Sequence, residues 1–167
     1  MELDILYEDD QLVAIHKPNG LIVHRTRIAN DAVEFALQIL RDQIAQKVFP
    51  THRLDRKTSG VLLFAKDEET NRHMQGQFMD QKVEKVYLAI VRGWVDDEGK
   101  IDTALTNDSG KIQKAVTNYR MLRRSEINLS NGKFLTSRYS LVEVRPESGR
   151  MHQIRKHFAH LRHPIIG

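Results

Sequence analysis

The chain has 167 residues, of which 40% are hydrophobic and 29% charged, and it contains no cysteine. This composition is typical of a globular domain, and it excludes disulfides and thiolate metal sites. The net charge is only +4, and the longest unbroken apolar run, from Val86 to Val91, is too short to cross a membrane.

The first half of the chain predicts a β-hairpin and two helices. The hairpin strands cover Leu3–Tyr7 and Leu12–His16, and a Pro-Asn-Gly turn follows them. Asp31 and Glu34 have the spacing of a capping box, and apolar residues from Val33 to Ile44 predict a helix after it. A second helix is expected from Glu68 to Gln81, with Met74 and Phe78 facing inward.

The second half predicts two strands and a last helix. The strands are expected at Val83–Val91 and Phe134–Val144, with Leu135, Ser137, Tyr139, Leu141 and Glu143 on one face of the second. Glu98-Gly99 and Ser109-Gly110 predict turns. The helix is expected from Gly149 to Leu161, and Pro164 stops it. Hairpins beside helices favour an α+β fold, with a mixed, largely antiparallel sheet flanked by helices.

The basic charge is concentrated near the end of the chain. Residues 145–163 hold one acid, Glu147, against five bases: Arg145, Arg150, Arg155, Lys156 and Arg162. On the expected helix, His152, Arg155 and Lys156 are spaced i, i+3 and i+4, which places them on one face. This face predicts either a phosphate-binding surface or an ordinary solvated helix face.

Two further segments are candidates for chemistry. Asp55 lies in the polar stretch Thr51–Gly60 among Arg53, Arg56 and Lys57, so it is either a catalytic carboxylate or a turn-capping residue. Tyr87 alternates with Lys85 and Ala89 on the expected strand, and it is either an acid–base or stacking group or a core tyrosine.

A metal site is not favoured. His157, His160 and His163 follow one another at intervals of three, but no carboxylate lies nearby in sequence. A protein metal site normally needs three or four converging ligands with a supported second shell.

Taken together, the motifs resemble one family. The segments His52-Arg53-Leu54-Asp55-x-x-Thr58-Ser59-Gly60, Lys85-x-Tyr87 and Gly149-Arg150-x-His152-Gln153-Ile154-Arg155-x-His157 follow one another in the order found in the pseudouridine synthases of the RluA family. The resemblance spans the whole chain as a single catalytic domain, residues 1–167, and is closest to members that act on tRNA.

The resemblance implies a role for each candidate. Asp55 would be the essential catalytic aspartate, Arg155 would pair with it, and Tyr87 would stack on the uracil and help remove its C5 proton. Arg53 would fill the space of the flipped nucleotide, and Ile154 would line the base pocket. His52, Arg150 and Lys156 are the further RNA-binding candidates.

The resemblance also sets expectations for the whole protein. It implies an RNA substrate, no cofactor and no metal, and we expect a cytoplasmic monomer that does not bind membranes. Many family members that act on ribosomal RNA begin with an S4-like domain, whereas this chain starts directly in the catalytic region, so we expect no S4 domain. Family members also continue past the point where this chain stops, so we expect that a C-terminal segment is lacking. The alternatives are a ribosomal RNA substrate, a non-catalytic RNA-binding module and, with least support, a metal-dependent nuclease.

Overall fold

The computed structural model describes residues 1–24, 34–130 and 132–167. The chain forms two compact units, Met1–Lys82 and Val83–Gly167. Each unit has its own antiparallel four-stranded sheet. This confirms the α+β class, with the strands divided between two sheets.

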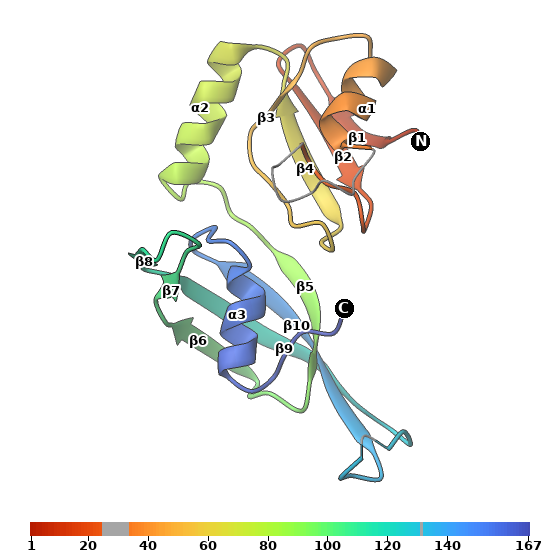
Figure 1. Ribbon diagram of the computed structural model, residues 1–167, viewed down its shortest axis with the longest axis vertical. Helices are drawn as coiled ribbons and strands as arrows, with labels where there is room; N and C mark the ends of the chain where they lie inside the picture. Colours follow the sequence, from red (N-terminus) through yellow and green to blue (C-terminus); the bar gives the residue numbers. More distant parts are fainter. Residues whose placement is uncertain (25–33, 131) are drawn as a thin grey trace. The chain divides into compact units, whose positions relative to one another are not determined.

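The N-terminal sheet has the strand order β1-β2-β4-β3 (Figure 1). Its strands are β1 (Asp4–Glu8), β2 (Leu12–Lys17), β3 (Phe49–Pro50) and β4 (Gly60–Ala65). The predicted hairpin is therefore confirmed. Its turn is closed by Asp9, whose Oδ1 accepts the backbone N–H groups of Gln11 at 2.8 Å and Leu12 at 2.6 Å.

Two helices accompany this sheet. Helix α2 (Glu68–Met79) begins at Asp67, whose carboxylate accepts the N–H of Thr70. Its residues Met74 and Phe78 are half-buried. Helix α1 (Ala36–Gln43) has Phe35 as N-cap and no side-chain cap, so Glu34 closes no capping box; Asp31 lies outside the described residues.

The start of α1 is fixed by the backbone instead of by a cap. The N–H groups of Ala36 and Leu37 donate to the carbonyl oxygens of Ile22 and Val23 at 2.9 and 3.0 Å. These bonds satisfy two of the donors that a helix N-terminus leaves open. Phe35 is buried at the same point, beside its bridge to Ile22.

The C-terminal sheet has the order β5-β10-β9-β6. Its strands are β5 (Tyr87–Arg92), β6 (Glu98–Asp102), β9 (Val116–Ile127) and β10 (Ser137–Pro146), and the short pair β7 (Leu105–Thr106) and β8 (Ile112–Gln113) stands apart. The turn predicted at Ser109-Gly110 joins β7 to β8, and Gly110 has a φ of +80°.

Three predictions for the strands and turns of this unit were wrong. β5 begins at Tyr87, four residues after the expected start, so Lys85 precedes the strand. Glu98-Gly99 opens β6 and is not a turn. β10 begins at Ser137, three residues after the expected Phe134, and its buried residues from Ser140 to Pro146 alternate with Tyr139, Leu141 and Glu143 of the expected face. The register with β9 shifts opposite Leu141 and Val142, where β9 has the extra residue Leu122.

Helix α3 (Gln153–His160) lies on one face of the C-terminal sheet (Figure 1). It is shorter than predicted because residues 149–150 have irregular backbone, residues 151–152 form a turn, and His152 has a left-handed backbone with φ of 54°. The helix completes a core that contains Val91, Val95, Ile101, Tyr119, Val142, Val144 and Phe158.

Candidate active site

The segment with Asp55 is anchored to β4 by the two residues that begin it. The hydroxyl and the N–H of Thr51 both donate to the carbonyl of Leu63, at 2.9 and 3.2 Å. The N–H of Leu63 in turn donates to Nε2 of His52 at 3.1 Å. The His52 ring also stacks on Phe78 of α2, with the ring centroids 4.6 Å apart.

Asp55 itself is half-buried and begins a tight turn. Its carbonyl accepts the N–H of Thr58 at 3.0 Å, and the neighbouring Leu54 is buried. Arg53 is exposed. Leu54 therefore holds the segment on the core, while Arg53 before it is exposed and Asp55 after it is half-buried.

A buried lysine supports this turn, and sequence reasoning missed its role. The side chain of Lys17 is fully buried, and its Nζ donates to the carbonyls of Pro18, Leu21 and Arg56 at 2.9, 2.8 and 3.2 Å. Burial lowers the pKa of Lys17 to about 8, and the charge of Asp55 opposes that shift. The sequence signal was the position of Lys17 at the end of β2, two residues after the buried Ile15 and therefore on the same face of the strand.

Further bonds join the same two turns. The N–H of Gly20 donates to the carbonyl of Arg56 at 2.8 Å, and the amide of Asn19 donates to the carbonyl of Lys57 at 2.7 Å. The guanidinium of Arg56 donates back to the carbonyl of Gly20 at 3.2 Å. The turn at Lys17–Gly20 thus fixes, through these hydrogen bonds, the backbone of the two residues that follow Asp55.

Tyr87 and Ile154 lie in the C-terminal unit and pack against the same hydrophobic core. Tyr87 opens β5 opposite Val144 and is half-buried, with Ala89 on the same face of the strand. Lys85 lies outside the strand, so the alternation with Tyr87 that its spacing predicted does not occur. Burial lowers the pKa of Lys85.

The basic residues around α3 bind carbonyl oxygens within their own unit. Arg155 is exposed and donates to Gly167 at 2.8 Å, Lys156 donates to Thr106 at 3.3 Å, and Arg150 donates to Lys114 at 3.2 Å. His152 precedes the helix in a left-handed conformation, so it does not continue the helical face of Arg155 and Lys156.

A buried polar network holds this segment on the sheet. Gln153 accepts bonds from the Ser148 hydroxyl at 2.7 Å and the Arg150 N–H at 3.0 Å. Its amide group donates to the Val116 carbonyl at 2.9 Å and to the Thr117 hydroxyl at 3.0 Å. Gln153 and Thr117 are both buried.

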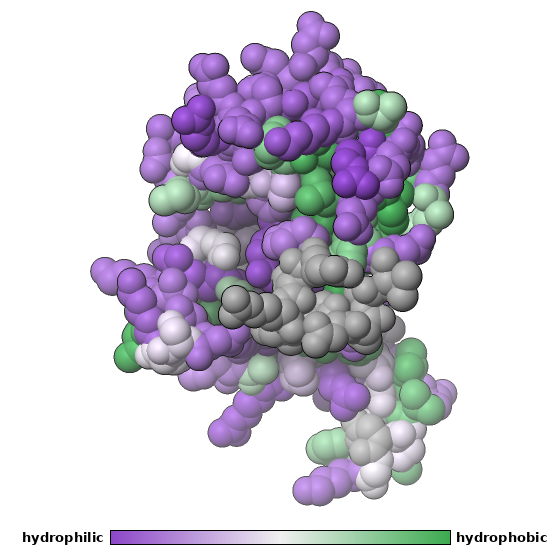
Figure 2. All heavy atoms as spheres, turned by 45° about the horizontal axis from the view of Figure 1, so that its top comes forward, coloured by the Kyte–Doolittle hydropathy of each residue, from purple (hydrophilic) through white to green (hydrophobic). Residues whose placement is uncertain are grey.

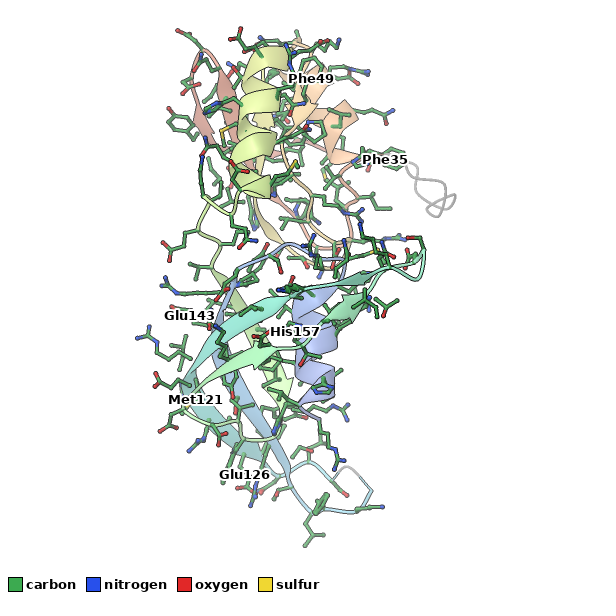
Figure 3. All side chains as sticks on the ribbon, turned by 90° about the vertical axis from the view of Figure 1, so that its left-hand side faces the viewer. Phe35, Phe49, Met121, Glu126, Glu143 and His157 are labelled. Carbon is green, nitrogen blue, oxygen red and sulfur yellow. The ribbon has the colours of Figure 1, made fainter. Side chains whose placement is uncertain are left out.

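His157 completes the network from α3 (Figure 3). Its Nε2 lies 2.9 Å from the carbonyl of Thr103, and its Nδ1 lies 2.9 Å from the hydroxyl of Thr117. A carbonyl only accepts, so Nε2 donates and, in the neutral ring, Nδ1 accepts the hydroxyl proton. Both nitrogens of this buried ring are thereby used.

The histidine series does not assemble a metal centre in the described part of the chain. His157 is committed to the two threonines, and Nδ1 of His163 lies 2.7 Å from the carbonyl of Arg92. Among residues 1–24, 34–130 and 132–167, no three histidine, aspartate or glutamate side chains converge as metal ligands.

No helix in residues 1–24, 34–130 and 132–167 is long and apolar enough to span a membrane.

Comparison with known proteins agrees with the motifs. Residues 11–160 match the family model described as RNA pseudouridylate synthase. The chain is 53% identical to tRNA pseudouridine synthase C of Haemophilus ducreyi, over the whole chain and 73% of that protein. It is 48% identical to the protein of the same name from Vibrio parahaemolyticus, over the whole chain and 72% of the relative.

A solved structure also resembles the chain. It is the human RNA pseudouridylate synthase domain containing 4, with a TM-score of 0.73 and 31% identity over 98% of this chain and 67% of the human one. The family model covers most of the chain, and the relatives match it from end to end. The chain therefore belongs to the RNA pseudouridylate synthase family.

Proposed function

We propose that this chain converts a specific uridine of tRNA into pseudouridine. The observation that carries the proposal is the similarity, along the whole chain, to relatives named tRNA pseudouridine synthase C. The supported turn that presents Asp55 adds a physical reason, because a catalytic carboxylate must be held in one geometry. Ribosomal RNA is the alternative substrate.

The reaction rearranges one nucleoside without redox change. The bond between C1′ and N1 of uridine breaks, the uracil turns, and a bond between C1′ and C5 forms. C5 then loses its proton, and N1 gains one. We propose that Asp55 acts on the nucleoside during these steps and that Arg155 keeps its carboxylate ionised. Tyr87 would stack on the uracil and help to remove the C5 proton.

Binding must bring the base out of its stack, which costs a few kcal/mol. Stacking on an aromatic ring such as Tyr87 recovers ~1–3 kcal/mol. Ile154 would line the pocket, and Arg53 would fill the space that the flipped nucleotide leaves. His52 would act indirectly, by anchoring the turn. Arg150 and Lys156 would contact phosphates, so binding should weaken as salt rises.

Asp55 belongs to one compact unit, and Tyr87 and Arg155 belong to the other. We therefore propose that both units are required and act together as one catalytic domain. No cofactor is needed for an isomerisation of this kind. We expect a monomer without membrane affinity that acts in the cytoplasm, where tRNA is its substrate.

The test is release of tritium from tRNA labelled at C5 of uridine, because only loss of the C5 hydrogen transfers the label to water. Unmodified tRNA is incubated with the wild type, with Asp55→Asn and with the control Asp10→Asn. Asp55→Asn keeps the size of the side chain and removes its charge. Asp10 is exposed in the turn of the first hairpin. Wild type and control should release tritium, and Asp55→Asn should not.

The other outcomes separate the alternatives. Release from ribosomal RNA alone would replace tRNA as the substrate. Activity that survives Asp55→Asn would remove Asp55 from the mechanism. Binding of RNA by the wild type with no release from either RNA would favour a non-catalytic module, and cleavage that requires a divalent metal would favour the nuclease.

A further inference from the structure

The longest hairpin of the C-terminal unit extends beyond its sheet (Figure 1). β6 pairs with β9 only as far as Arg120, and β5 pairs with β10 only from Tyr139 onward. Between these points β9 and β10 pair with each other alone. We name residues 121–138 the hairpin arm; within it, residue 131 lies outside the described part.

The end of the hairpin arm presents large apolar side chains to solvent (Figure 2). Leu135 is 89% exposed, Phe134 67% and Leu129 58%. Turns at the end of a hairpin are normally formed by polar residues and glycine. Apolar side chains that gather at one exposed place mark an interaction site, because leaving them in water is unfavourable.

The base of the hairpin arm is braced by contacts with residues 94–97. The indole N–H of Trp94 donates to the carbonyl of Ser125 at 3.2 Å, and the guanidinium of Arg138 lies over the same indole, 4.2 Å from the ring centroid. Arg124 donates to the carbonyl of Val95 at 2.8 Å and to Asp97 at 3.0 Å. A preorganised surface loses less freedom on binding than a flexible one.

The charge of the hairpin arm favours an anionic partner. It contains four cations and one acid, which are Arg123, Arg124, Lys133, Arg138 and Glu126. The acid is already engaged, by Thr136 at 2.5 Å and by Arg138 at 3.3 Å (Glu126 is labelled in Figure 3). Arg123 and Lys133 are exposed, and within the described residues neither forms an ion pair.

These features together fit RNA. Exposed cations bind phosphates, an aromatic ring stacks on an unpaired base, and leucine and phenylalanine are among the side chains that wedge between bases. A protein partner would use the apolar residues but would give no reason for unpaired cations beside them. Resting on the proposed function, we propose that the hairpin arm is a second RNA-binding surface of this enzyme.

The position of the hairpin arm predicts which RNA needs it. Tyr87 pairs with Val144 of β10, whereas the last β9–β10 pair toward the end of the hairpin arm is the one between Ser137 and Ile127. Seven residues of β-strand span roughly 24 Å, at about 3.4 Å per residue. The end of the hairpin arm therefore contacts a part of the folded RNA distant from the nucleotide that stacks on Tyr87. An RNA hairpin that carries the target uridine and is shorter than this distance would not reach it.

The experiment compares binding and turnover for two RNAs. The probes are unmodified full-length tRNA and a short RNA hairpin that carries the uridine mapped by tritium release. The double variant Phe134→Ala/Leu135→Ala removes the apolar end, and Met79→Ala, an equally exposed apolar residue on α2, is the control. For tRNA, the double variant should raise Kd and KM by ~5- to 150-fold with kcat unchanged, since one stacked base contributes that much. Binding of the short hairpin should not change.

A second variant tests the charges. Arg123→Ala/Lys133→Ala should reduce the slope of log Kd against log salt by about 2, because each lost phosphate contact reduces it by roughly 1. If both double variants bind tRNA as the wild type does, the inference is wrong. It is also wrong if the apolar variant changes the oligomeric state and leaves tRNA affinity unchanged, since the end of the hairpin arm would then bind a second copy.

Binding separates this inference from the proposed function. Absence of tritium release with a Kd that still depends on the hairpin arm would refute the proposed reaction and keep the RNA-binding surface. Normal tritium release with a Kd that does not change in the hairpin-arm variants would support the proposed reaction and refute the RNA-binding surface.

Discussion

Replacing Gln153 tests whether the polar network under α3 stabilises the C-terminal unit. Gln153→Ala removes four hydrogen bonds of a buried side chain. Two partners keep another bond, because the Val116 carbonyl accepts the N–H of Glu147 and the Thr117 hydroxyl contacts His157. The Ser148 hydroxyl and the Arg150 N–H lose their acceptor.

The size of the effect follows from these two groups. A buried donor without a partner costs ~1–3 kcal/mol, and Ser148 is buried while Arg150 is half-buried. The cavity left by the shortened side chain adds a further ~1–2 kcal/mol. We expect the free energy of unfolding to fall by about 3–5 kcal/mol for Gln153→Ala. Gln153→Met fills most of the cavity and should still lose roughly 2–4 kcal/mol.

Urea unfolding followed by tryptophan fluorescence measures this, because the single tryptophan, Trp94, lies in the affected unit. The control is Gln75→Ala, which shortens an exposed glutamine on α2 and should leave the Trp94 transition unchanged. If Gln153→Met were as stable as the wild type to within about 0.5 kcal/mol, the hydrogen bonds would contribute nothing net, and the reasoning from burial would fail.

Three further predictions concern stability. Between pH 8 and 10.5 the unfolded chain binds more protons at Lys17 than the folded chain. The free energy of unfolding of the wild type, measured in urea, should therefore rise with pH relative to that of Lys17→Met, by up to about 3 kcal/mol across this range. Gly99→Ala should lower the Tm because its Cβ would lie 2.6 Å from the Tyr119 ring, which should cost ~1–3 kcal/mol of stability. In the control Gly76→Ala, the added Cβ meets no atom within 4 Å, so the Tm should stay unchanged or rise. Asp67→Ala removes the N-cap of α2, so the helical signal in circular dichroism should fall, and equal spectra would contradict that role.

Local sequence pattern was sufficient to predict those elements whose structure depends on interactions between residues near one another in the sequence. The first hairpin was predicted because apolar strands flank a polar turn, and α2 because a helical pattern follows residue 67. The start of α1 was not predictable, since distant carbonyls of Ile22 and Val23 replace the side-chain cap. Gly99 resembled a turn residue, but the space it leaves is occupied by Tyr119 from the neighbouring strand. Such contacts have no signature in the local sequence.

Strand β9 was not predicted, for a related reason. Only its first residues, such as Thr117 and Tyr119, are buried, and the exposed remainder in the hairpin arm has no apolar alternation. The site was predicted through motifs instead of through geometry. Asp55 stood out because of its neighbours, whereas the role of Lys17 depends on complete burial among three carbonyls, and its place at the end of a strand does not specify those partners.

The order of strands in the two sheets has a consequence for synthesis on the ribosome. All four strands of the N-terminal sheet are present once residue 65 has been made, so this sheet can pair while the rest of the chain is still being translated. β5, in contrast, pairs with β10, which begins at Ser137, and its other edge bonds to residues 164–166, which are made later still. Until then its backbone edge has no partner, and the nascent chain passes through an interval in which β5 is open to aggregation or chaperone binding.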